Sequence, residues 1–64
     1  MDTSEKKILI VEDNLIVGSD LKKTLEQFGY YVTGIAMSGY EAVEIFRESI
    51  PDLVLMDVML KGEH

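Results

Sequence analysis

The feature that most constrains the fold is the alternation of short apolar runs with helical patterns. Residues 8–11, ILIV, form an apolar, β-branched run that is typical of a strand buried on both faces. Two similar runs, YYVTGIAM at 30–37 and DLVLMDVML at 52–60, predict a second and a third strand. The segment between each two runs is short and has a helical pattern. Such a segment favours a helical crossover between parallel strands, so the sequence predicts an open α/β sheet.

The first intervening segment, 14–28, has the pattern of an amphipathic helix. Its apolar residues recur at spacings of four, four and three, and polar residues are available for the other side. The predicted apolar stripe consists of Val17, Leu21, Leu25 and Phe28. Gly29 stands where a residue in the left-handed conformation would end the helix.

The second intervening segment begins with a helix-capping signal. Ser38 is the predicted N-cap, and Glu41 three residues later would complete a capping box. Pro51 is expected to stop the helix. The predicted apolar stripe consists of Ala42, Val43, Phe46 and Ile50.

Composition narrows the classes of partner. Twelve acidic residues against six basic ones give a net charge of -6, which argues against binding nucleic acid or an anionic membrane surface and favours cations. The chain has no cysteine, which excludes disulfides and thiolate metal sites. No apolar run approaches the roughly 20 residues that a transmembrane helix needs, and the start, MDTSEKK, does not resemble a signal peptide. We therefore expect a cytoplasmic protein without a membrane partner.

Three carboxylates stand at or near the carboxyl ends of predicted strands. Glu12 and Asp13 follow the first strand, and Asp57 interrupts the apolar run 53–60 of the third. If these two strands are neighbours, the three acids converge and repel one another unless a cation lies between them. Carboxylate oxygens without His or Cys suit Mg²⁺. Asp57 would then be both a metal ligand and a candidate nucleophile.

Structural roles are the alternative for each of these residues. Asp57 could cap a neighbouring turn at a strand end, although the apolar residues on both sides favour a buried strand position. Asp13 could cap the first helix, and both Glu12 and Asp13 could be stabilised by the helix dipole. Asn14 is expected to be a cap or a first-turn residue rather than a ligand.

Three segments in this order, KKILIVEDN at 6–14, SGYEAVEIF at 38–46 and PDLVLMDVML at 51–60, resemble the first half of a response-regulator receiver domain of two-component signalling. The resemblance implies a truncated flavodoxin-like fold with strand order 2-1-3. It further implies that Asp57 accepts a phosphoryl group from a histidine kinase or phosphotransfer protein. Its implied Mg²⁺ ligands are Glu12, Asp13, Asp57 and the backbone carbonyl of Met59. Such a module assists its own phosphorylation and is not a separate enzyme.

The chain also departs from the receiver pattern. Glu12 stands where many receivers have Asp. A whole receiver would also continue through two more strands and three helices, with a hydroxyl residue on its fourth strand and a lysine on its fifth. Residues 1–64 are therefore expected to be a partial receiver domain that is not fully competent for phosphorylation. The alternatives are a structural or engineered half-domain that self-associates through the exposed edge of its third strand, and a phosphohydrolase fragment. Met59, where a phosphohydrolase usually has a second acid, disfavours the last.

Overall fold

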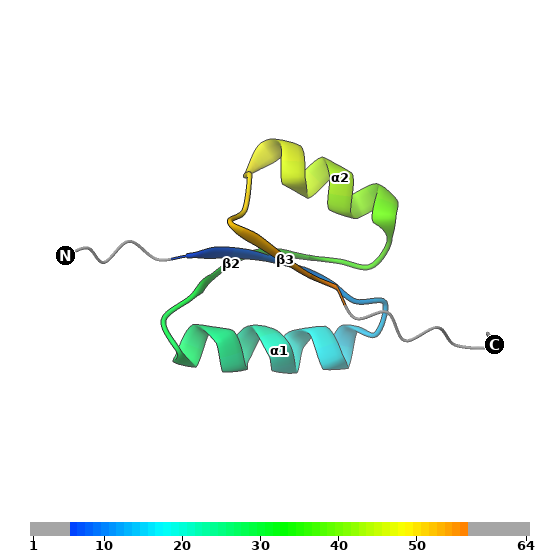
Figure 1. Cartoon of the computed structure of the whole chain (residues 1–64). Helices are drawn as coiled ribbons and strands as arrows, with labels where there is room; N and C mark the ends of the chain where they lie inside the picture. The colour runs from blue at the N-terminus through cyan, green and yellow to red at the C-terminus, as the bar shows by residue number, and fades with distance from the viewer. Residues whose placement is uncertain (1–5, 57–64) are drawn as a thin grey trace.

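The computed structural model describes residues 6–56, which form a three-stranded parallel sheet with the order β2-β1-β3 (Figure 1). This confirms the predicted strand order and the alternation of strands and helices. Neither of the described helices is long and apolar enough to cross a membrane. The elements are β1 (Lys7–Val11), α1 (Leu15–Gln27), β2 (Tyr31–Ala36), α2 (Gly39–Glu48) and β3 (Leu53–Met56).

Hydrogen bonds at the amino ends of the strands align the sheet. The Lys7 backbone N–H donates to Asp52 Oδ2 over 2.7 Å, and the Asp52 N–H donates to the Lys7 carbonyl over 2.8 Å. In the resulting register, Val11 is opposite Met56 in β3 and Ala36 in β2. The ends of the three described strands therefore lie level at the carboxyl edge of the sheet.

The two helices cover opposite faces of the sheet, with α1 on one side and α2 on the other (Figure 1). The central strand, β1, carries Leu9 and Ile10, which are fully buried. The main apolar core lies between the sheet and α1, because alternate residues of β1 point to this face. It consists of Ile8, Ile10 and Val32, against which Leu21, Leu25, Ile35 and Leu55 pack.

A β-bulge in β2 changes which residues face each helix. The pairing with β1 passes from Val32 to Gly34 and skips Thr33. Val32 therefore belongs to the core on the α1 face, whereas Gly34 faces α2, where a Cβ atom would lie 3.2 Å from Ile45 Cδ1. A bulge inserts one extra residue and so reverses the alternation of faces.

The predicted apolar stripe of α1 is wrong at both of its ends. Phe28 is the C-cap residue and is 74% exposed, and Val17 is exposed as well. The buried residue of the helix is Gly18, and the series Gly18, Leu21, Leu25 has helical spacings of three and then four residues. A Cβ atom at this position would lie 2.9 Å from Ile35 Cγ2, so the helix lies close to the sheet here.

The second helix begins after Ser38, as predicted, but it ends before the last residue of the predicted apolar stripe. Ser38 Oγ accepts the Glu41 N–H over 3.2 Å, but the Glu41 carboxylate accepts the N–H of Met37 rather than that of Ser38, over 2.8 Å. Ile50 lies outside α2 and is 67% exposed, which corrects its place in the apolar stripe. The residue before a proline is disfavoured in helical conformation, so the helix stops at Glu48.

Gly29 allows a direct test of the turn after α1. Its φ of 92° is one that residues with a side chain adopt at a cost of about 1 kcal/mol. We expect Gly29→Ala to lower the free energy of unfolding by about this amount, measured by urea denaturation with circular dichroism. Gly39→Ala is the matched control, because a Cβ at either position meets nothing within 4 Å and Gly39 has no positive φ. Equal effects of the two substitutions would contradict this explanation.

Candidate acidic site

Glu12 and Asp13 lie where β1 leaves the carboxyl edge of the sheet, as predicted. The Glu12 backbone N–H donates to the Ala36 carbonyl over 2.8 Å, which extends the β1–β2 pairing by one residue. The Glu12 side chain is buried, with an exposed fraction of 5%, whereas Asp13 is exposed. The two neighbouring carboxylates therefore occupy different environments at the same edge.

The Glu12 carboxylate is held by the turn that leads into α1. Its Oε2 atom accepts the backbone N–H of Asn14 over 2.9 Å. Among the described residues, Glu12 is the one acidic or basic residue that is buried. Because burial of a carboxylate is costly without hydrogen bonds or charges to stabilise it, this environment marks Glu12 as a candidate functional group.

Asn14 caps α1, which confirms the structural role expected for it. Its side-chain Oδ1 accepts the N–H groups of Ile16 and Val17 over 3.0 and 3.2 Å. The interpretation of Asp13 as the N-cap of this helix is therefore wrong. Asp13 precedes the cap and remains at the exposed edge of the sheet.

Asp57 and Met59, the other two predicted site residues, lie outside the described residues. The described part of β3 ends at Met56, which is opposite Val11, the residue before Glu12. Within residues 6–56, no group of three or more His, Cys, Asp or Glu side chains could hold a metal ion. The two described carboxylates offer oxygen donors alone, which is the ligand chemistry that Mg²⁺ prefers.

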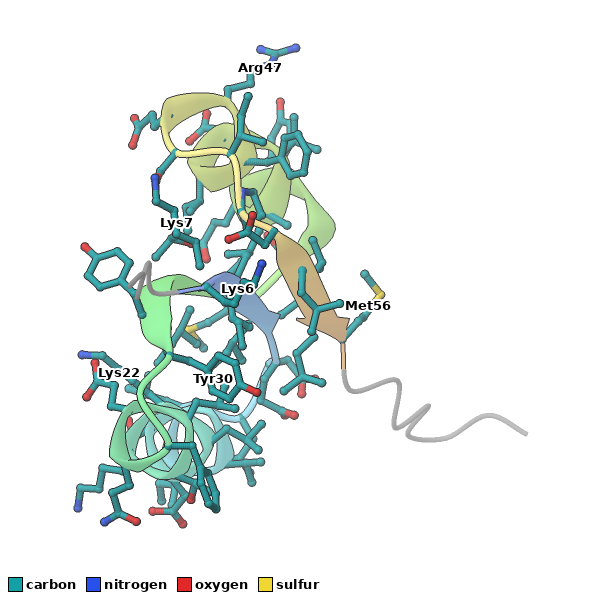
Figure 2. All side chains as sticks on the ribbon, turned by 60° about the vertical axis from the view of Figure 1, so that its left-hand side comes forward. Lys6, Lys7, Lys22, Tyr30, Arg47 and Met56 are labelled. Carbon is teal, nitrogen blue, oxygen red and sulfur yellow. The ribbon has the colours of Figure 1, made fainter. Side chains whose placement is uncertain are left out.

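An apolar groove of about 390 Å³ runs between α2 and the outer strand β3. Val11, Val43, Phe46, Val54 and Met56 are among the residues that line it. Both helices lie over β1 and β2 rather than over β3, so β3 is only partly covered, although Leu55 packs against the main core. Figure 2 shows the Met56 side chain pointing away from the rest of the sheet. Sequence reasoning placed Val43 and Phe46 on a packed stripe, but both are exposed at the groove.

The fold and the acidic edge together define an open parallel α/β domain with carboxylates beyond the carboxyl end of its central strand. The model of the response regulator receiver domain matches residues 8–64. The chain belongs to this family, which confirms the resemblance seen in the sequence.

Similar proteins include regulators of several kinds. The chain is 42% identical over 55 residues to the transcriptional regulatory protein PdtaR of Mycobacterium tuberculosis, covering 86% of this chain and 27% of PdtaR. It is also 42% identical to the chemotaxis protein CheY of Thermotoga maritima, again over 86% of this chain and over 46% of CheY. The chain thus spans less than half the length of these relatives.

A solved structure has the same fold. The crystal structure of the anti-anti-sigma factor PhyR from Bartonella quintana superposes with a TM-score of 0.85 and 28% sequence identity. The match covers 98% of this chain and 26% of PhyR. The similarity supports the receiver-like arrangement of all three strands and both helices.

Proposed function

We propose that this chain is the phosphoacceptor part of a two-component signalling protein, and that Asp57 receives a phosphoryl group from a histidine kinase or phosphotransfer protein. The observation that carries the proposal is the placement of Glu12 and Asp13 at the carboxyl end of β1. That end is level with Met56, the residue before Asp57. Ligands of open parallel sheets bind at this edge.

In the proposed reaction, a carboxylate oxygen of Asp57 attacks the phosphorus of a phosphohistidine. The new O–P bond forms as the P–N bond breaks, and the histidine nitrogen retains the electron pair. Bound Mg²⁺ would neutralise charge on the phosphoryl oxygens. Glu12, Asp13, Asp57 and the Met59 carbonyl would hold it, directly or through water. The contribution of the chain is placement and charge, and it acts as a phosphoacceptor rather than as a separate enzyme.

Metal binding is tested on the 64-residue chain. We expect Mg²⁺ to bind weakly, and Asp13→Ala to weaken it further because an oxygen ligand at the sheet edge is lost. Two-dimensional NMR titration of the isotope-labelled chain measures the dissociation constant. Asp20→Ala is the control, since Asp20 is also exposed and lies on α1. Identical affinity of wild type and Asp13→Ala would refute the assignment of Asp13.

The transfer reaction itself is tested in a longer chain. Residues 1–64 would be followed by the remaining part of the T. maritima chemotaxis protein, of which the match covers 46%. Incubation with acetyl phosphate should add the mass of one phosphoryl group in the presence of Mg²⁺ and none in excess EDTA. We expect the 64-residue chain alone to react slowly or not at all.

We also propose that the 64-residue chain self-associates through β3. This strand is one of the two outer strands of the described sheet, both helices lie over the other two strands, and Leu53 and Met56 are each 56% exposed. An edge strand with unpaired backbone groups and apolar side chains is prone to pair with another strand. A second copy supplies an identical edge, and two-fold symmetry makes that pairing antiparallel. The two acidic sites would then lie on opposite rims of one continuous sheet and would remain separate.

A further inference from the structure

At Gly18, beside the acidic site, α1 lies close to the sheet. A Cβ atom on Gly18 would lie 2.9 Å from Ile35 Cγ2 and 3.7 Å from Glu12 Cγ. The first distance is too short for two carbon atoms, so one of the groups would have to move. Cγ2 is attached to the branched Cβ of a strand residue, whose rotamer is restricted, and it is not the flexible end of a long side chain. An added methyl group would therefore push the first turn of α1 away from β2.

The first turn of α1 is connected to Glu12 through Asn14. The Gly18 N–H donates to the Asn14 carbonyl over 2.9 Å, and the Asn14 side chain caps the same turn. The Asn14 N–H in turn donates to Glu12 Oε2 over 2.9 Å. A displacement of this turn would consequently change the hydrogen bond that orients the Glu12 carboxylate.

We infer that Gly18 is a positioning residue for the Glu12 carboxylate, because its missing side chain lets α1 lie close enough for the Asn14 N–H to hold Glu12. The inference rests on the proposed Mg²⁺ site. Groups that orient a metal ligand without touching the metal typically contribute about 10-fold to 100-fold in affinity. Glu has one more rotatable bond than Asp, so its carboxylate depends more strongly on such an orienting contact.

The main experiment compares two glycines that both lie close to a neighbouring side chain. In Gly18→Ala, NMR titration of the isotope-labelled chain should show Mg²⁺ affinity lowered about tenfold. Gly34→Ala is the matched control, because its Cβ would meet Ile45 at 3.2 and 3.3 Å on the opposite face of the sheet. We expect its Mg²⁺ affinity to equal that of the wild type, even where stability falls. Equal affinity of Gly18→Ala and wild type would overturn the inference.

A rescue variant separates positioning from general destabilisation. Ile35→Ala removes the Cγ2 atom that an alanine at position 18 would meet. The double variant Gly18→Ala/Ile35→Ala should regain the Mg²⁺ affinity of the Ile35→Ala single variant. Failure of this rescue in a folded double variant would contradict the steric explanation.

Two NMR measurements on the Asn14 amide test the inference in other ways. The first does not depend on Mg²⁺ binding, and the second does not depend on the stability of a variant. Without Mg²⁺, the Asn14 amide should exchange with solvent about tenfold faster, relative to global unfolding, in Gly18→Ala and not in Gly34→Ala. Unchanged exchange would contradict the positioning role even if Mg²⁺ binds.

The second measurement uses the wild-type chain. Mg²⁺ should shift the Asn14 amide resonance more than that of Gly34. An unshifted Asn14 resonance in a chain that binds Mg²⁺ would overturn the inference. Absence of any Mg²⁺ binding, with the exchange result as expected, would refute the metal proposal alone.

Discussion

Asp57→Asn is expected to abolish phosphoryl incorporation in the chimera of residues 1–64 with the remaining part of the T. maritima chemotaxis protein. The amide of asparagine carries no negative charge and is a poor nucleophile, so it cannot replace a carboxylate oxygen in attacking phosphorus. It would also remove one charge from the proposed Mg²⁺ site. Intact-mass measurement after incubation with acetyl phosphate and Mg²⁺ gives the result, with the unsubstituted chimera as the reference.

Asp52→Asn is the matched control for this experiment. Asp52 immediately precedes β3 at the amino end of the sheet, where its carboxylate accepts the Lys7 N–H over 2.7 Å. The same chemical change is therefore made at the end of the strand opposite to the proposed site. We expect normal labelling of Asp52→Asn. Undiminished labelling of Asp57→Asn would count against Asp57 as the acceptor.

The second large effect concerns self-association of the 64-residue chain. Val54→Lys places a charge in the middle of β3, where the valine is 36% exposed and lines the apolar groove. Lysine on an edge strand opposes strand pairing because its charge would have to be desolvated at the interface. We expect light scattering to show a dimer for the wild type and a monomer for Val54→Lys.

Val17→Lys provides the comparison for that substitution. Val17 is the same residue type, is 38% exposed and lies on α1, which lies over β1 and β2 rather than over β3. The Val17→Lys chain should remain dimeric. Dissociation by Val17→Lys but not by Val54→Lys would indicate an interface between helix faces and refute strand pairing. A wild-type chain that is a monodisperse monomer with a sharp thermal transition would contradict self-association altogether.

Local sequence signals predicted most of the fold, because they depend on groups that are close along the chain. Ser38 caps α2 and Gly29 ends α1 as expected, since each role is fixed by the backbone conformation of one or two residues. The alternation of apolar runs with helical patterns predicted the order of the elements. The strand order 2-1-3 came from the resemblance to receivers and is confirmed.

The errors arise where packing between elements decides the outcome. Gly18 has no apolar side chain and so lay outside the predicted stripe, although it precedes Leu21 by three residues and Leu25 by seven, which was a usable signal. The bulge at Thr33 has no clear pattern in the sequence, yet it determines that Gly34 faces Ile45. Both features depend on distances between backbones that the sequence alone does not give.

The candidate site could be predicted in part, because some of its features follow from the local sequence and others depend on packing. Glu12 and Asp13 follow directly from the end of an apolar strand, so their position at the sheet edge could be predicted. The hydrogen bond from Asn14 to Glu12 could not be, because it depends on the rotamer of a glutamate and on the first turn of α1. Asp57 and Met59 lie beyond the described residues, and their roles stay predictions.

Locating the phosphoryl group in the unsubstituted chimera is the most direct test of the proposed function. Borohydride reduction converts an aspartyl phosphate into homoserine, and tandem mass spectrometry then identifies the modified position in the peptide that contains residues 52–60. We predict Mg²⁺-dependent conversion at Asp57, with Asp52 in the same peptide unchanged. Conversion at Glu12, Asp13 or another acid while Asp57 remains unmodified would contradict the assignment of Asp57 as the phosphoacceptor.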